Sequence, residues 1–115
     1  MPVIGFKKHF KEAIISGEKR QTIRKQWIRP IKLGDTLFLS IGMRTKNYQR
    51  LKVAECSSVT PVTIRTSSVT LDGRDLNAKE IEEFAKLDGF STAQAFYDFF
   101  EENRGLPFDG IVIKW

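Results

Sequence analysis

The sequence predicts an α+β fold: a small, mostly antiparallel β-barrel with flanking short helices. Three observations carry this prediction. Short segments with alternating apolar residues recur along the chain, as in half-buried strands. Three helical patterns occur as well, but not in regular alternation with the strands, which disfavours a parallel βαβ fold. A length of 115 residues suits one domain, residues 1–115, and closing its sheet would remove exposed strand edges.

The first expected element is a short amphipathic helix over residues 7–16. Apolar residues fall at helical spacing there, namely Phe6, Phe10, Ala13 and Ile14. Gly17 ends the helix, because glycine adopts the left-handed conformation at little cost. Residues 17–24 should then form a turn that leads into a short strand, and the polar segment 25–33 a loop.

Strands are expected wherever apolar residues alternate between turn residues. The clearest is 36–41, which follows the Gly34-Asp35 turn and places Leu37, Leu39 and Ile41 on one face. The other strands are expected at 49–57, once or twice within 59–71, and at 110–115.

Two more helices are expected in the second half, each with a capping box at its start. The first box is Asn77-Ala-Lys-Glu80, followed by an apolar stripe that includes Asp88 and by a stop at Gly89. The second is Ser91-Thr-Ala-Gln94, and its helix ends at Gly105. The apolar face of this last helix consists of Phe96, Phe99 and Phe100.

The charge distribution is asymmetric. Residues 1–52 hold thirteen Lys and Arg against three acids, a net charge of +10, whereas residues 53–115 hold six against eleven, a net charge of −5. A basic half favours a polyanionic partner such as nucleic acid. The alternative is a solvated face whose charges meet the acidic half in the folded protein.

Composition argues against several classes of protein and of site. No run approaches the roughly 20 apolar residues of a membrane helix, and the start has no apolar signal segment, so we expect a cytoplasmic protein without a membrane partner. Cys56 and His9 are the only cysteine and histidine. We therefore expect no metal site and no cofactor, with Cys56 as a small core residue and His9 at the surface.

The strongest candidate site is the segment Gly17–Arg24. If residues 22–24 are extended, Thr22 and Arg24 share one face, and Lys19 can reach the same face from the turn. An ammonium, a hydroxyl and a guanidinium suit an anionic or carbonyl-bearing ligand. Partial burial would also let Lys19 act as a base. The alternative is an exposed, charged turn.

The next segment adds cations around an aromatic residue. Trp27 could stack on an unpaired base while its basic neighbours hold the backbone. The neighbours in question are Arg24, Lys25, Arg29 and Lys32. Alternatively, Trp27 packs on the core beside a solvated loop.

Several pieces of the chain form a pattern with this segment. They are Phe6–Phe10 before a helix, Gly17-x-Lys19-x-x-Thr22-Ile23-Arg24, Gly34-Asp35 before a strand, Phe84-Ala-x-x-Asp88-Gly-Phe, and the closing Phe108-x-Gly110-x-x-Ile113-x-Trp115. The pattern resembles the ASCH domain family, small β-barrels of the PUA-like superfamily, over nearly the whole chain. The resemblance implies a cleft that binds RNA or modified nucleosides.

One bacterial branch of that family resembles an acetylcytidine amidohydrolase that uses a Lys, a Thr and a Glu. Lys19 and Thr22 match the first two positions, and Asp88, one methylene shorter than Glu, falls at the third. Other members resemble ribonucleases or plain RNA binders.

We therefore expect an RNA- or nucleobase-binding domain whose basic cleft is lined by Lys19, Thr22 and Arg24. The alternative is a hydrolase, an acetylated-cytidine amidohydrolase or a ribonuclease, that uses Lys19, Thr22 and Asp88. An Asp88 carboxylate within hydrogen-bonding reach of Lys19 or Thr22 would favour the hydrolase. A third hypothesis is a protein-interaction module, which needs the Phe96, Phe99 and Phe100 face to be exposed.

Overall fold

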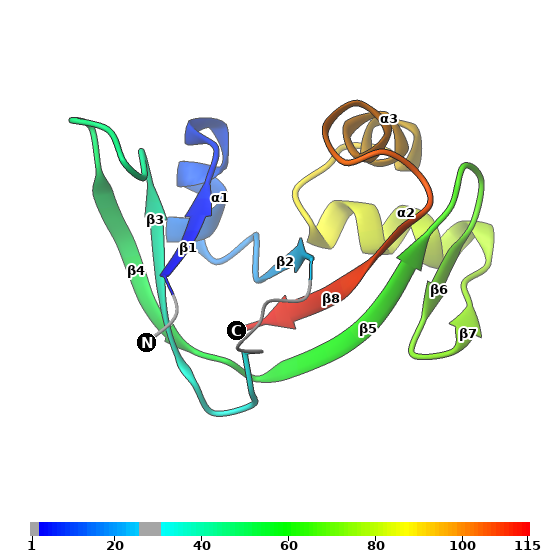
Figure 1. The fold of residues 1–115 in the computed structure, drawn as a ribbon, viewed down its shortest axis with the longest axis horizontal. Coiled ribbons are helices and arrows are strands. Elements are labelled where there is room, and N and C mark those ends of the chain that lie inside the picture. The colour runs from blue at the N-terminus through cyan, green and yellow to red at the C-terminus, as the bar shows by residue number, and fades with distance from the viewer. Residues whose placement is uncertain (1–2, 26–30) are drawn as a thin grey trace.

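The computed structural model describes residues 3–25 and 31–115, which form an α+β fold. Figure 1 shows its elements in chain order. They are β1 (Val3–Phe6), the 3-10 helix η1 (Lys8–Phe10), α1 (Lys11–Ser16), β2 (Gln21–Arg24), β3 (Thr36–Ile41), β4 (Gln49–Glu55), β5 (Ser58–Ile64), β6 (Val69–Leu71), β7 (Arg74–Asp75), α2 (Ala78–Leu87), α3 (Ala93–Asn103) and β8 (Phe108–Lys114).

The strands form two sheets. One has the order β1-β3-β4, with β1 parallel and β4 antiparallel to β3. The other is antiparallel throughout, in the order β2-β8-β5-β6-β7. In Figure 1 the first sheet lies beside α1, and the second lies beneath α2 and α3.

The predicted closed barrel does not form among the described residues, where no strand pair joins the two sheets. The exposed edges are instead kept short. Three of the four edge strands, β1, β2 and β7, have only four, four and two residues. A short edge offers few unpaired backbone groups to another chain, so it reduces the need for closure.

Two apolar clusters hold the elements together, and β8 belongs to both. Its alternation places Ile111 and Ile113 in the cluster with β1, β3 and α1, whereas Val112 packs beneath α2 and α3. Trp115 continues the first face, as predicted, and its ring meets Phe6 edge-on at 5.8 Å. The elements that carry the candidate site are therefore anchored to one central strand.

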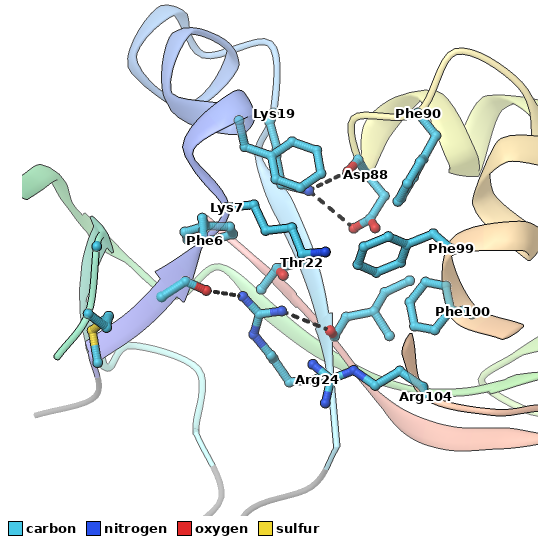
Figure 2. Close-up of a pocket in the computed structure, with 15 residues that line it drawn as sticks. Phe6, Lys7, Lys19, Thr22, Arg24, Asp88, Phe90, Phe99, Phe100 and Arg104 are labelled. Atoms are coloured by element: carbon cyan, nitrogen blue, oxygen red, sulfur yellow. Dashed lines mark hydrogen bonds and ion pairs between the residues drawn. The ribbon is translucent and has the colours of Figure 1, made fainter. Parts of the chain in front are cut away.

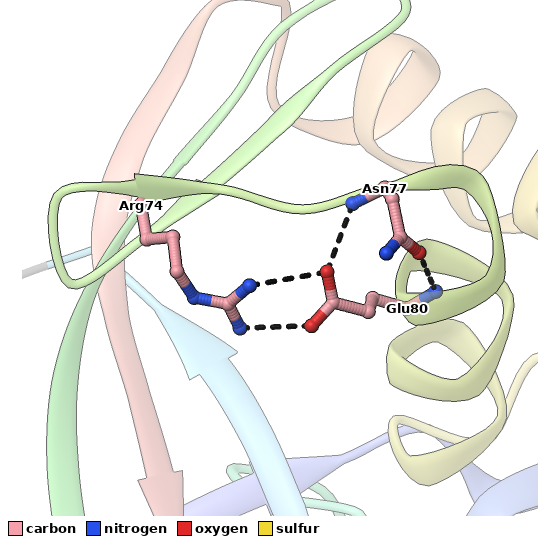
Figure 3. Close-up of polar contacts among 3 residues, drawn as sticks. All are labelled: Arg74, Asn77 and Glu80. Carbon is pink, nitrogen blue, oxygen red and sulfur yellow. Dashed lines mark hydrogen bonds and ion pairs between the residues drawn. The ribbon is translucent and has the colours of Figure 1, made fainter.

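The caps of α2 and α3 fix where these helices begin. Asn77 Oδ1 accepts a hydrogen bond from Glu80 N at 2.9 Å, and Glu80 Oε1 accepts one from Asn77 N at 3.1 Å (Figure 3). This capping box confirms the prediction. The predicted cap of α3 is wrong by one residue, since Thr92 rather than Ser91 accepts from Ala95 N.

Within the described ranges, no helix is long and apolar enough to cross a membrane.

Candidate functional site

Strand β2 directs Thr22 and Arg24 to the same side of the sheet. It pairs with β8 through Thr22 opposite Ile113 and Arg24 opposite Ile111. The intervening Ile23 packs in the cluster beneath α2 and α3. The alternation expected of residues 22–24 is therefore present, and it turns a hydroxyl and a guanidinium toward the same space.

Lys19 reaches that space because the chain folds back after α1. Gly17 has φ +88° and ends the helix, and Lys19 N then donates to Ala13 O at 2.9 Å. The side chain is only 2% exposed, and its Nζ lies 4.6 Å from the centre of the Phe10 ring. A buried ammonium over an aromatic face gains a cation–π interaction but loses most of its hydration.

Asp88 meets Lys19 from the end of α2. Its Oδ1 lies 3.5 Å from Lys19 Nζ, and Lys19 Nζ also donates a hydrogen bond to the Asp88 backbone carbonyl (Figure 2). Gly89 permits this approach. It has φ +97°, and a Cβ there would lie 2.7 Å from Cε1 of Phe10. The Asp88 carboxylate therefore lies within ion-pair distance of Lys19 Nζ, but its Oδ1 has no hydrogen-bond partner among the described residues.

Burial shifts the titration of both partners toward their neutral forms. It lowers the pKa of Lys19 below its usual 10.5, although the Asp88 carboxylate opposes the shift and Arg24 adds to it. It also raises the pKa of Asp88 to about 6, although the nearby charge of Lys19 opposes this shift. Both shifts favour the neutral forms of the two groups, and perturbed pairs of this kind are common at sites of acid–base chemistry.

Arg24 is held by the backbone and by a ring. Its Nη2 donates to the Gly5 carbonyl, its Nη1 donates weakly to the Ile23 carbonyl at 3.5 Å, and the guanidinium lies 5.1 Å from the centre of the Phe6 ring. Burial, then the nearby charge of Arg104, lowers the pKa of Arg24 to about 10. Two guanidinium groups that repel each other are well placed to receive an anion.

These side chains line one pocket of about 520 Å³, between β1, η1, β2, α3 and the loop after β3 (Figure 2). Its polar and charged lining consists of Lys7, Lys19, Thr22, Arg24, Asp88 and Arg104. Its aromatic lining consists of Phe6, Phe10, Phe90, Phe99 and Phe100. The volume falls in the range typical of small-molecule sites, roughly 300–1,000 Å³. Lys19, Thr22, Arg24 and Asp88 therefore converge in one concavity.

Much of this lining was not predicted from the sequence. Lys7 and Arg104 stand at opposite ends of the chain, and the five phenylalanines come from β1, η1, α3 and the segment before it. Helical spacing had already marked Phe10 and Phe99 as apolar faces, but spacing alone does not distinguish a core residue from a pocket wall. Phe6, Phe10 and Phe90 also lie in the ASCH-like pattern, but that pattern did not assign them to the wall of a pocket.

The remaining predicted binding residues lie apart from the pocket or outside the described residues. Lys25 and Lys32 are exposed and do not line the pocket. Trp27 and Arg29 fall within 26–30, which the structure does not describe. The prediction that Trp27 stacks on a base therefore stays a prediction.

Other candidate centres offer little. Cys56 is buried in the core and His9 is exposed, both as predicted. Among residues 3–25 and 31–115, no three His, Cys, Asp or Glu side chains gather in a way that could hold a metal ion. Phe96 and Phe100 are buried, which removes the main support for a protein-interaction module.

Comparison of the chain with protein families, with curated proteins and with solved structures finds no match. The resemblance to ASCH domains therefore stays a prediction from the sequence. A proposal for function has to rest on the chemistry of the pocket itself.

Proposed function

We propose that the pocket binds an unpaired nucleobase or nucleoside of RNA, and that the chain is an ASCH-like domain of the PUA-like superfamily. The observation that carries the proposal is the convergence of Lys19, Thr22 and Arg24 in a pocket walled by phenylalanines. Aromatic faces stack on bases of any sequence, and cations hold the phosphate beside them.

The pocket offers distinct chemistry to each part of such a ligand. Phe90 and Phe99 present partly exposed rings on which a base can stack. Arg24 and Arg104 together can hold a phosphate or a ring carbonyl, and an anion between them relieves their repulsion. The Thr22 hydroxyl can donate to or accept from a polar edge of the base.

A titration with short single-stranded RNA and with free nucleosides, followed by fluorescence polarisation and calorimetry, tests the proposal. Arg24→Ala should weaken binding by about 10- to 100-fold, the cost of losing a hydrogen bond to a charged group. Arg74→Ala removes the same charge from β7 and serves as the matched control. RNA binding that ignores salt, or that survives Arg24→Ala combined with Trp27→Ala, would contradict the proposal.

A second candidate function is hydrolysis of an acylated cytidine or of RNA itself, favoured by the contact between Lys19 and Asp88. In the amide reaction, Thr22 Oγ1 attacks the acyl carbon and neutral Lys19 takes the hydroxyl proton. The C–N bond then breaks, and the departing exocyclic nitrogen receives that proton. Water finally hydrolyses the acyl–Thr22 ester to a free carboxylic acid. Asp88 acts as the acid or holds Lys19 in place.

Incubation with a panel of acylated nucleosides and RNAs, read by mass spectrometry, tests this second function. Loss of the acyl mass from one substrate, abolished by Lys19→Ala, is the expected result. Turnover that is unchanged in Lys19→Ala would rule out the assignment of Lys19 as base. No turnover of any substrate, together with tight binding, would leave the binding function alone.

A further inference from the structure

A second hollow adjoins the pocket on the side of β3 and β4. Its volume is about 710 Å³, and its walls are η1 and α1 on one side and the loop between β3 and β4 on the other. Gly42 lines both concavities, so the two are neighbours at this residue. Its lining residues are Lys8, Lys11, Ile41, Gly42, Thr45, Asn47, Tyr48 and Gln49.

All the charge in this lining is positive. Lys8 and Lys11 supply it, and no acidic side chain contributes. Neither lysine forms an ion pair with any described residue. The loop adds two exposed cations, Arg44 and Lys46, and the nearest acid along η1 and α1 is the exposed Glu12. The lining therefore carries a positive charge that no ion pair in the described part of the chain offsets.

The wall opposite the lysines is polar and well fixed. Thr45 Oγ1 donates to the Gly42 carbonyl at 2.7 Å and accepts from Asn47 N at 3.1 Å. The Tyr48 hydroxyl lies 3.1 Å from Ser40 Oγ, which holds its half-exposed ring in place. A fixed, accessible aromatic ring beside two cations is the arrangement that single-stranded nucleic acids use, base on ring and backbone on cations.

We infer that this second hollow holds the sugar-phosphate backbone of the nucleotides next to the one in the first pocket. The ligand is then a single strand of several nucleotides rather than a free nucleoside, and this inference rests on the proposed function of the pocket. One nucleotide occupies the first pocket and leaves Lys8 and Lys11 without an anion. A phosphodiester chain that continues past Gly42 supplies one to each.

The shape and composition of the hollow favour a strand over an anionic membrane. Membrane-surface sites insert apolar side chains into the interface, whereas here the single apolar lining side chain, Ile41, is buried. The site is also concave, which suits a chain that can enter it.

The test compares the affinity of free cytidine with that of an eight-nucleotide single-stranded RNA at several salt concentrations. In the wild type, the strand should bind at least tenfold more tightly than cytidine at low salt. Lys8→Ala/Lys11→Ala should leave cytidine affinity unchanged. It should also make the slope of log affinity against log salt shallower for the strand by about 1.4, or about 0.7 for each phosphate that the variant no longer neutralises.

Two controls separate the possible failures. Arg65→Ala/Lys79→Ala removes the same charge from exposed positions in the β5–β6 turn and in α2, and should keep the wild-type slope. A strand that binds no better than cytidine, or an unchanged slope in Lys8→Ala/Lys11→Ala, overturns the inference while leaving the pocket's function intact. If the wild type binds neither cytidine nor the strand, the proposed function is overturned as well. Lysine-dependent binding to phosphatidylserine vesicles without binding to the strand also overturns the inference.

Discussion

Residues 3–25 and 31–115 contain two ion pairs of opposite character. Arg74 and Glu80 form a surface pair with two parallel bonds of 3.1 and 2.9 Å, and their side chains are 65% and 32% exposed (Figure 3). Lys19 and Asp88 form a buried pair with a looser contact of 3.5 Å, and their side chains are 2% and 7% exposed. The better geometry therefore belongs to the pair that water screens most strongly.

The pKa directions separate the two pairs further. At the surface, the pKa of Arg74 is raised and that of Glu80 lowered, each mainly by the hydrogen bonds between them, so each stabilises the other's charge. In the interior, burial outweighs the attraction, so the pKa of Lys19 falls and that of Asp88 rises. A buried pair that costs stability and lines a pocket supports the acid–base chemistry proposed above.

Replacing Lys19 should have the largest effect of all, on turnover, and it tests whether the buried and surface pairs differ in function. If the buried pair is catalytic, Lys19→Met should lower turnover of the acylated cytidine by about 100- to 10,000-fold, because it removes the general base. The matched change at the surface, Arg74→Met, should leave turnover unchanged. Equal turnover in both variants, measured by steady-state kinetics, would assign the buried pair a structural role.

The pH dependence of stability should reveal the cost of Asp88. The unfolded carboxyl has a pKa of 3.8 and the folded one a pKa of about 6. Between these values the unfolded chain binds fewer protons, so this group makes the free energy of unfolding fall as pH rises, by up to about 3 kcal/mol. Asp88→Asn lacks this loss, and its stability relative to wild type should rise from pH 4 to pH 7. Urea unfolding of both proteins measures the difference, and a flat difference would contradict the pKa.

Removing both buried charges should sharpen the contrast between stability and function. Lys19→Met/Asp88→Leu replaces the pair with apolar groups and should stabilise the fold, by on the order of 1–4 kcal/mol, while abolishing activity. Thermal unfolding and the turnover assay on the same preparation test both halves. A strongly destabilised double variant would show that the pair supports the fold.

The surface pair should give the smallest effects. Asn77→Ala removes one half of the capping box that also engages Glu80, and should cost about 1 kcal/mol of stability. Arg74→Met should cost less than Asn77→Ala, because an exposed ion pair contributes little. Chemical unfolding of the two variants side by side ranks them, and a larger loss of stability in Arg74→Met would reverse the comparison.

Elements fixed by local sequence could be predicted well. Strand β3 has the expected bounds, because its alternation and its preceding turn are both local. The Asn77 box and the Gly17 stop were also predicted, since each depends on residues within one helical turn. By contrast, β1 was missed. Its four residues form a strand through parallel pairing with β3, a distant segment of the chain.

The candidate site divides in the same way. Alternation along 22–24 placed Thr22 and Arg24 on one face, and the helix stop brought Lys19 near them. Asp88 entered only through the family resemblance, because its contact with Lys19 spans 69 residues. Phe99 joins the pocket from α3, and Arg104 joins it from the C-terminal end of that helix. No local pattern encodes where α3 lies relative to β2. Long-range packing, rather than propensity, completes the pocket.

The most direct test of the central claim is an NMR titration of the ¹⁵N-labelled protein with cytidine and with short single-stranded RNA. We expect saturable shifts at the amides of Thr22, Arg24, Gly89 and Phe90, and their loss in Arg24→Ala. Saturable shifts confined to other parts of the chain, or none with any nucleoside or strand, would contradict a nucleobase pocket built on Lys19, Thr22 and Arg24.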